Sequence, residues 1–375
     1  MRFSTLIRYP ANWMTGGDGH GGAVLTSRIR LARNLRDLPF PGWAKRGQRD
    51  EALRRMRPAV ESLPVMKDAF SQELNRLDSV QKQVLVERHL ISREHAARGD
   101  GSAVVIERKQ HLSLMLNEED HLRMQSIRSG LQLSDAYEAL NEVDSQLEHE
   151  LEYAFDSKLG YLTTCPTNLG TAMRASAMLH LPGLVLSDQI GQVLQGVNKI
   201  GLAVRGLYGE GTDSLGNLYQ ISNQSTLGET EGDIIRRLER VIAQVAMHEQ
   251  NAREKLLEDD PAMVADKVGR AYGLLRHSHL IESKEALNLL SLLRLGGNLE
   301  YFNEDTVKLC DELLMEIQPA HLQLHAGRKL TPEERDAIRA KIIRDRLQSL
   351  DSPDIYSGKR RTGEDSASPD NSQDA

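Results

Sequence analysis

Arginines at alternate positions of a short segment could bind the phosphates of a nucleotide. In residues 27–30 (SRIR), an extended backbone would place Arg28 and Arg30 on the same face. Two guanidinium groups side by side can hold phosphate oxygens through paired hydrogen bonds. Further arginines in short motif-like segments are Arg123, Arg174 and Arg205. Taken singly, each of these arginines is more simply a solvated surface charge, and spacing alone does not join them.

Three consecutive carboxylates follow an apolar run. Residues 112–116 (LSLML) are typical of a strand, and Glu118, Glu119 and Asp120 come shortly after it. A carboxylate that follows a strand directly is held firmly, which catalysis on a cationic substrate requires. The simpler alternative is a polar turn and a helix N-terminus, where acids interact favourably with the helix dipole. Both interpretations stay open at this level.

One of the two cysteines also lies at a predicted strand end. Cys165 follows residues 160–164, which we expect to be a strand, and precedes a Pro-Thr-Asn turn. It could be a reactive thiol, although a lone cysteine is more often buried filler. Cys310 is far away in sequence, so the cysteines form neither a disulfide framework nor a zinc ligand set. This cysteine usage fits a reducing cytosol.

A glycine-rich run at residues 16–22 satisfies the GxGxxG spacing through Gly17, Gly19 and Gly22. The run precedes an apparent strand instead of following one and opening a helix, so we interpret it as a flexible loop. The sequence contains no GxxxxGK[ST], which excludes a P-loop. If ATP binds, its phosphates must be neutralised by something other than a glycine cradle, and arginine side chains could do this.

The first two thirds of the chain mix strand and helix patterns. The expected strands are residues 103–107, 112–116, 160–164, 200–204 and 218–222. The expected helices are residues 49–60, 73–86, 133–153 and 173–180. Strands next to strands, interleaved with helices, predict an α+β domain with a mostly antiparallel sheet flanked by helices. We assign this domain to residues 1–255.

From about residue 231 onward the pattern is helix after helix. The expected helices are residues 234–257, 261–277, 283–295, 304–317 and 332–350. Thr331, Pro332 and a glutamate that closes a capping box mark the last helix start clearly. We expect an all-α C-terminal domain at residues 256–350. Residues 351–375 are rich in Asp, Ser, Gly and Pro, which predicts a disordered tail.

Bulk composition excludes several classes of protein. The formal net charge of the 375-residue chain is -7 at pH 7, so no global basic surface indicates direct binding of nucleic acid. No stretch approaches the roughly 18 apolar residues of a membrane-spanning helix. The N-terminus has no signal-peptide pattern, and we expect a cytoplasmic protein.

Taken together, the motifs resemble the phosphagen (guanidino) kinase family. Four blocks stand in the family's order: SRIRLARN at 27–34, NEEDHLR at 117–123, CPTNLGT and RAS at 165–176, and RGLYGE at 205–210. The chain resembles in particular the bacterial protein arginine kinases. It starts almost at SRIR, has the RGLYGE form, and carries the RDxxRA signature in an added helical domain. It departs from the family at Ala172, where glycine is usual and the extra methyl could force a different turn.

The resemblance implies a guanidino-kinase catalytic domain that uses ATP and Mg²⁺ to phosphorylate arginine guanidinium groups in proteins. It implies Glu119 as the catalytic carboxylate, Glu210 as a second carboxylate on the guanidinium, and Cys165 as an assisting thiol. His89 is a weaker candidate for contacting the nucleotide base. The other residues assigned to nucleotide binding are Ser27, Arg28, Ile29, Arg30, Arg123, Arg174, Ala175, Ser176, Ala177, Met178, Arg205, Gly206, Leu207, Tyr208 and Gly209.

The C-terminal domain carries a second expected site. Arg335 and Arg339 are four residues apart and would lie on one helix face, where two guanidinium groups can hold a phosphate. The resemblance implies an allosteric phosphoarginine pocket there. Its residues are Arg335, Asp336, Arg339 and Ala340.

The resemblance also bears on partners and on competing functions. It implies protein substrates with exposed arginine, an activator protein, a Clp-type protease that degrades marked proteins, and a role in stress control. A homodimer would suit the apolar faces of the helical domain. Two alternatives remain open: a small-molecule kinase for free arginine, and a non-catalytic adaptor that binds partners through its helices.

Overall fold

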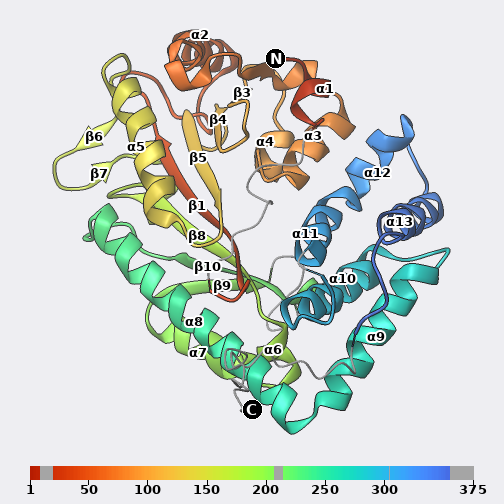
Figure 1. The fold of residues 1–375 in the computed structure, drawn as a ribbon. Helices are drawn as coiled ribbons and strands as arrows, with labels where there is room; N and C mark the ends of the chain where they lie inside the picture. The colour runs from red at the N-terminus through yellow and green to blue at the C-terminus, as the bar shows by residue number, and fades with distance from the viewer. Residues whose placement is uncertain (9–19, 207–213, 304, 355–375) are drawn as a thin grey trace, which may run out of the picture.

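The computed structural model describes residues 1–8, 20–206, 214–303 and 305–354. Its centre is an eight-stranded sheet in the order β2-β3-β4-β5-β1-β8-β10-β9, in which all neighbours are antiparallel (Figure 1). The eight strands are β1 (Val24–Arg33), β2 (Phe70–Glu73), β3 (Ala103–Ile106), β4 (Leu112–Leu116), β5 (Leu122–Ser129), β8 (Met173–His180), β9 (Leu202–Gly206) and β10 (Leu218–Asn223). The expected α+β fold with a mostly antiparallel sheet is confirmed.

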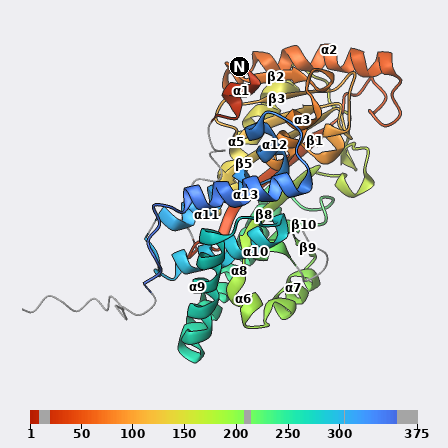
Figure 2. The same ribbon diagram turned by 90° about the vertical axis from the view of Figure 1, so that its right-hand side faces the viewer.

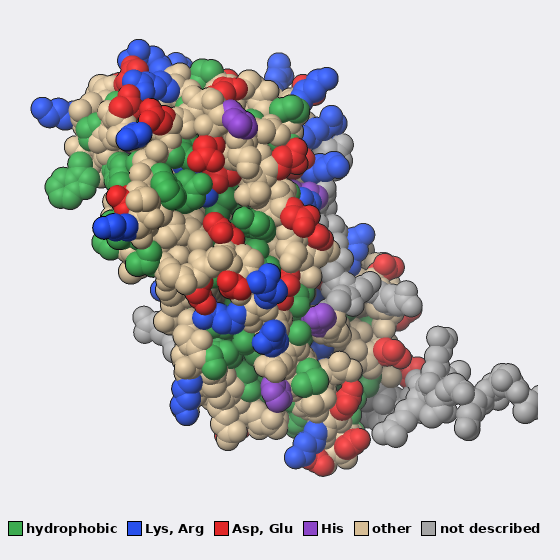
Figure 3. Space-filling view, turned by 90° about the vertical axis from the view of Figure 1, so that its left-hand side faces the viewer, with side chains coloured by type: hydrophobic (Ala, Val, Ile, Leu, Met, Phe, Trp, Pro, Cys, Tyr) green, Lys and Arg blue, Asp and Glu red, His purple; other side chains and the backbone are tan. Residues whose placement is uncertain are grey.

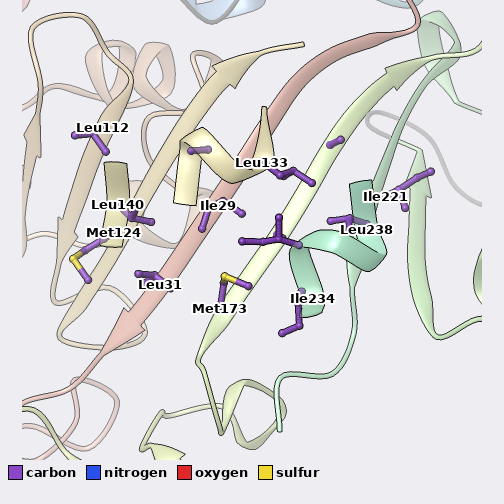
Figure 4. Packing of buried hydrophobic residues seen from close by; sticks show 14 of the residues in the cluster. Ile29, Leu31, Leu112, Met124, Leu133, Leu140, Met173, Ile221, Ile234 and Leu238 are labelled. Carbon is purple, nitrogen blue, oxygen red and sulfur yellow. The ribbon is translucent and has the colours of Figure 1, made fainter. Parts of the chain in front are cut away.

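Helices α5 (Leu133–Glu148) and α8 (Glu231–Asp259) cover one face of this sheet. Strand alternation sends Ile29 and Leu31 of β1 toward those helices, where they are buried with Leu238 of α8 (Figure 4). The residues that alternate with them, Arg28 and Arg30, therefore point to the opposite face. The division of each central strand into an apolar face and a polar face is what positions the candidate site.

The predicted helix at residues 173–180 is wrong, because this segment is strand β8. Met173, Ala175, Ala177 and Leu179 are buried in the core, whereas Arg174 is only partly buried. This period of two matches a strand paired on both sides, with β1 and with β10. The segment is short and has no β-branched residue, so local propensity did not reveal its strand character.

Residues 73–86 are also not one helix. Glu73 ends β2, a 3-10 turn follows at Leu74–Arg76, and helix α3 begins at Ser79 and ends at Glu87. Asp78 explains that start, since its side chain accepts a hydrogen bond from the backbone N–H of Gln81 at 2.8 Å. The predicted strand at 160–164 is reduced to β7 (Gly160–Tyr161), which pairs with β6 (Phe155–Asp156) in a separate hairpin.

The remaining helices flank the sheet or form the C-terminal part (Figure 2). Those outside the C-terminal part are α1 (Phe3–Leu6), α2 (Arg46–Ser62), α4 (Arg93–Ala96), α6 (Pro182–Leu186) and α7 (Ile190–Lys199). The C-terminal part contains α9 (Pro261–His277), α10 (Ser283–Asn298), α11 (Asp305–Glu316), α12 (Pro319–Ala326) and α13 (Pro332–Arg346), packed around a core of their own. Helix α8 runs without interruption through residue 255, and α12 had not been expected from the sequence. Within the described ranges, no helix has the length and apolar character needed to cross a membrane.

A buried glutamate fixes the C-terminal helices to the sheet-bearing part. The carboxylate of Glu87, at the end of α3, accepts hydrogen bonds from the backbone N–H groups of Ala320 and His321 at 2.8 and 3.2 Å. The ring Nδ1 of His321 lies 2.8 Å from the same carboxylate. Glu87 therefore caps the N-terminus of α12, where acidic groups interact favourably with the unpaired N–H groups.

A second buried contact joins α10 to the sheet. Arg294 donates to Asp311 at 2.7 Å and to the backbone carbonyl of Gly22 at 2.8 Å. The ring Nε2 of His180, at the end of β8, lies 2.7 Å from the hydroxyl of Ser291. These paired polar groups hold the C-terminal helices at a fixed position beside the polar face of the sheet.

Candidate active site

Strand register brings the predicted arginines to one face of the sheet. Arg30 of β1 lies directly opposite Arg174 of β8. Arg123 of β5 is opposite Ala32, two residues beyond Arg30 and therefore on the same face. The resulting cleft of about 960 Å³ is lined by five arginines of the sheet strands, namely Arg28, Arg30, Arg123, Arg174 and Arg205, and also by Arg93 and Arg335 from helices. We call this space the active-site cleft.

These arginines are desolvated and repel one another. Burial, and then the charges of Arg123 and Arg174, lower the pKa of Arg28 to about 10. Burial, and then the charges of Arg28, Arg123 and Arg174, lower the pKa of Arg30 well below its usual value. The buried Nε atoms of Arg30 and Arg174 have no hydrogen-bond partner among the described residues. An anion with several oxygens would supply both the charge and the acceptors that the cluster lacks.

Glu118 is the one carboxylate bound directly to an arginine of this cluster within the described ranges. Both of its oxygens lie 2.7 Å from Nη1 of Arg123, and Oε2 accepts the backbone N–H of Glu119 at 2.8 Å. Burial alone would raise the pKa of Glu118, but the charge and hydrogen bonds of Arg123 lower it to about 2. Glu118 thus stays ionised and fixes the positions of the Arg123 side chain and of the backbone N–H of Glu119.

Glu119 itself is partly buried and faces like charges. Burial, and then the charges of Asp120 and Glu118, raise the pKa of the Glu119 carboxyl, against the opposing effect of Arg123. The five-residue link between β4 and β5 is a tight turn that Asn117 enters with φ +56°, where its backbone N–H donates to the carbonyl of His121 at 2.8 Å. No helix follows it, so the alternative of a helix N-terminus is wrong.

The acidic turn and the cysteine loop are joined by Thr164. Its hydroxyl donates to the carbonyl of Glu119 at 2.9 Å, and its backbone N–H donates to Oδ1 of Asp120 at 2.7 Å. The next residue, Cys165, is partly exposed, with Sγ 3.0 Å from the hydroxyl of Thr167. Burial, and then the charges of Arg205 and Arg123, lower the pKa of Arg174, against a smaller opposing effect of Cys165. Glu119 and Cys165 do not themselves line the cleft, but each lies close enough to one of its arginines, Arg123 and Arg174 respectively, for their charges to interact.

Ala172 occupies the position where the resembling family usually has glycine. It adopts φ +51°, in the left-handed region that glycine enters without cost. Its carbonyl still accepts the backbone N–H of Ala32 at 3.1 Å. The alanine thus adopts a left-handed conformation that glycine would favour at this position.

The other predicted nucleotide-binding residues divide by strand face. Ile29, Ala175 and Ala177 lie in the core on the far face, and buried Ser27 donates to the carbonyl of Gly130 at 2.7 Å. Their side chains do not point into the cleft. The residues that line the cleft or the small pocket beside it are His89, Ser176, Met178 and Gly206. Leu207, Tyr208, Gly209 and Glu210, like Gly17 and Gly19, lie outside the described residues.

His89 lies in the loop after α3 with φ +56° and lines both the cleft and the small pocket. Burial, and then the charge of Arg28, lower the pKa of its imidazole to about 4. The ring is therefore neutral at pH 7, which suits contact with an uncharged base better than contact with phosphate.

The two arginines of the RDxxRA motif have different surroundings. Arg339 is buried and donates to the carbonyls of Ile281 and Ile317 at 2.8 and 3.2 Å and to Asp336 at 2.5 Å. Arg335 is partly exposed and lines the active-site cleft on the helical side, together with Lys284. Ala340 belongs to the core of the C-terminal helices. Arg335 and Arg339 therefore differ in accessibility: Arg335 faces the cleft, whereas the guanidinium group of Arg339 is already bonded within the protein.

Sequence reasoning missed several residues that line or shape the cleft. Gln220 of β10 accepts from Arg28 at 3.2 Å, and Asn34 donates to Asp120 at 2.6 Å. Glu94 of α4 also lines the cleft. None of them belongs to a recognisable local pattern except Asn34, the last residue of the SRIRLARN block, so only the arrangement of distant segments in the fold reveals them.

The buried Glu118–Arg123 pair leads to a pH-dependent prediction. Folding lowers the pKa of Glu118 from 4.5 to about 2, so its ionised form stabilises the fold fully above pH 4.5, and this contribution is lost as the pH falls toward 2. We expect Glu118→Gln to lower the free energy of unfolding by about 3 kcal/mol at neutral pH, because Arg123 loses its buried partner.

Urea unfolding between about pH 7 and about pH 3 measures this difference, which should narrow as the pH falls. Glu142→Gln, on the exposed side of α5, is the control and should change stability by less than about 0.5 kcal/mol. A Glu118→Gln difference that stays constant over this pH range would contradict the assignment.

Comparisons with known proteins agree with this geometry. Residues 52–252 match the model of the ATP:guanido phosphotransferase C-terminal catalytic domain, and residues 261–358 match the model of the protein-arginine kinase McsB C-terminal domain. The chain is 44% identical to a protein-arginine kinase of Halothermothrix orenii, over 90% of this chain and 96% of the relative. It is 46% identical to a protein-arginine kinase of Bacillus cereus, over 90% of this chain and 95% of the relative.

Solved structures share the fold. A lombricine kinase is 25% identical, with a TM-score of 0.53, and the match covers 65% of this chain and 70% of that one. The duplicated taurocyamine kinase of Schistosoma mansoni is 22% identical, with a TM-score of 0.59 over 80% of this chain and 49% of that one. With the family model matching more than half of the chain and two relatives aligned over nine tenths of it, the chain belongs to the protein-arginine kinases, within the ATP:guanido phosphotransferase family of ATP-dependent phosphotransferases.

Proposed function

We propose that this chain transfers the γ-phosphoryl group of ATP to the guanidinium group of arginine residues in proteins. The observation that carries the proposal is the juxtaposition of five cleft arginines with the Glu119 turn, which Thr164 joins to the Cys165 loop. The arginines suit a polyphosphate, and the carboxylate suits a cation. The relatives' names supply the class of acceptor.

The arginines would neutralise and align the phosphates. Phosphoryl transfer depends mainly on holding donor and acceptor in line and on stabilising charge on the transferring group. Guanidinium groups fixed on neighbouring strands can do this without reorganising during the reaction. The described residues contain no group of three or more His, Cys, Asp or Glu side chains that could hold a metal. Mg²⁺ would therefore enter with ATP, bound mainly by phosphate oxygens.

Glu119 would prepare the nucleophile. Arginine has a pKa above about 12, and a carboxylate beside it can orient one nitrogen for attack and accept its proton. In the step proposed here, that nitrogen bonds to the γ-phosphorus as the bond to the ADP oxygen breaks, and the released proton passes to Glu119. Glu210 is proposed as the second carboxylate and Cys165 as an assisting thiol near the guanidinium.

Replacing the Glu119 carboxylate gives the direct test. We expect Glu119→Gln to lower phosphoarginine formation on casein by about 10²- to 10⁴-fold, because the amide cannot accept the proton. Mass spectrometry without acid treatment detects the acid-labile N–P bond. Glu142→Gln, an exposed glutamate on α5, should retain wild-type activity.

The same assay separates the alternatives. ATP turnover with free arginine, but no phosphoarginine on protein, would favour a small-molecule guanidino kinase. The raised pKa of Glu119 also predicts the pH dependence of activity. As the pH is lowered, wild-type activity should begin to fall while the pH is still above 4.5, the ordinary pKa of a glutamate, because the Glu119 carboxyl becomes protonated there.

The arginine cluster predicts opposite effects on stability and binding. We expect Arg30→Met to stabilise the nucleotide-free protein by about 1 to 2 kcal/mol, because it removes a desolvated charge that three arginines repel. The same change should strongly reduce the rise in melting temperature that ATP produces in the wild type.

Thermal melting with and without ATP measures both effects. Arg240→Met, an exposed arginine on α8, is the matched control and should alter neither. A destabilised Arg30→Met variant that still responds fully to ATP would contradict the proposed role of the cluster.

We also propose, from the resemblance, that phosphorylated proteins pass to a Clp-type protease and that the chain acts in stress control in the cytoplasm. An activator protein and a homodimeric state belong to the same proposal, as does the division into residues 1–255, 256–350 and 351–375. The support is that the relatives with high coverage are protein-arginine kinases and that the McsB C-terminal model matches residues 261–358.

For the allosteric pocket we propose unequal roles for the RDxxRA residues. Arg335 would contact the phosphate of phosphoarginine, whereas Arg339 and Asp336 would fix α13 to its neighbours through the bonds described above. Arg335→Ala should abolish activation by phosphoarginine peptides and leave the KM for ATP unchanged. Arg328→Ala, an exposed arginine paired with Glu334, is the control. A raised KM for ATP in Arg335→Ala would instead assign Arg335 to the nucleotide.

A further inference from the structure

Exposed hydrophobic side chains gather on the loops around the Cys165 segment. Nine large hydrophobic side chains are exposed among the described residues, and four of them lie on three loops that border residues 164–170. These four are Trp43, Phe155, Leu159 and Leu227, with 84%, 57%, 43% and 51% of their surfaces exposed. We call them the apolar rim. Figure 3, which views the side that carries β6 and β7 in Figure 1, shows hydrophobic side chains at the surface among charged ones.

All three loops contact residues 164–170, the segment that contains Cys165. The β6–β7 hairpin touches it where the backbone N–H of Gly170 donates to the carbonyl of Leu159 at 2.8 Å. In the loop after β10, the hydroxyl of Thr226 donates to the carbonyl of Leu169 at 2.6 Å. In the loop after β1, Gly42 lies beside the side chain of Thr164.

The rim residues are attached to these contact points at short range. Leu227 follows Thr226 directly, and Trp43 follows Gly42 directly. Phe155 pairs with Tyr161 across the hairpin, with ring centroids 5.3 Å apart. Single exposed hydrophobic residues are normal on a protein surface, but four grouped around one site indicate an interaction surface.

We infer that the apolar rim binds hydrophobic residues that flank the acceptor arginine in an extended, unfolded segment of a protein substrate. This inference rests on the proposed function and names the kind of substrate. Each residue of an extended chain advances by about 3.3–3.6 Å, so two or three residues on either side of an arginine held at Glu119 reach about 10 Å around it. Glu119 is hydrogen-bonded to Thr164, at the start of the segment that all three loops border, so flanking residues of this reach would approach the rim.

The rim also gives a physical reason for selecting unfolded segments. In a folded protein, hydrophobic neighbours of a surface arginine are mostly buried and cannot reach the rim. In an unfolded segment they are exposed, and burying them against the rim removes apolar surface of both chains from water. The arginine itself would be recognised by the carboxylate, and its surroundings by the rim.

Two blocked synthetic peptides test the inference with the full chain. Both contain one arginine in a Gly-Ser background, and one has leucines at the two positions on each side. We expect the wild type to phosphorylate both and to show a KM about tenfold lower for the leucine-flanked peptide. In Phe155→Ser/Leu227→Ser this preference should fall to within about twofold, with kcat and the KM for ATP unchanged.

A matched control and distinct outcomes keep the test decisive. Met247→Ser, which removes an exposed hydrophobic side chain from α8 on the far face of the sheet, should keep the full preference. Equal KM values for the two peptides in the wild type, or an unchanged preference in the double variant, would overturn the inference and leave the proposed function intact.

Two further outcomes would also overturn it. Light scattering that shows a change of oligomeric state in the double variant, with its peptide preference unchanged, would identify the rim as a contact between copies of this chain. Phosphoarginine on neither peptide nor on casein would reject the proposed function, and the inference with it.

Discussion

The desolvated positive charge on one face of the central sheet is the constraint on which the rest of the structure depends. Arg28, Arg30 and Arg174 are brought together by register, although their mutual repulsion and their burial oppose folding. The opposite face of the same strands supplies the compensating stability, because Ile29, Leu31 and their neighbours are fully buried beneath α5 and α8. A sheet with one apolar and one cationic face can hold such a cluster rigidly, which a loop could not.

The acidic turn places two neighbouring carboxylates in different environments. The carboxylate of Glu118 is fully occupied by hydrogen bonds from Arg123 and from the backbone N–H of Glu119, so it cannot also bind a substrate. Glu119 has no arginine partner among the described residues, and its pKa moves in the opposite direction. Two adjacent residues of the same type therefore have different environments: Glu118 is bound within the site, and Glu119 is available for the catalytic role proposed for it.

Much of the site could be predicted from sequence, because its residues lie in short contiguous blocks. The same blocks did not reveal which faces their residues occupy. Residues 173–180 looked helical, and only pairing with β1 and β10 shows that Arg174 points to the cleft while Ala175 points to the core. The RDxxRA motif likewise could not reveal that Arg339 is occupied by carbonyls of Ile281 and Ile317, which come from separate parts of the chain. Long-range pairing decides these questions, and a single sequence carries little information about it.

The contact between Glu87 and the start of α12 has a consequence for how this protein could have diversified. One wall of the cleft comes from α3 and α4 and another from the C-terminal helices, and the capped helix locks them together. The C-terminal helices are thus an integral part of the cleft and cannot be exchanged freely between relatives. A chimaera that joins the N-terminal part of one homologue to the helices of another must preserve this acid and the N-terminus that it caps, and recombination is constrained to keep both halves of the contact together.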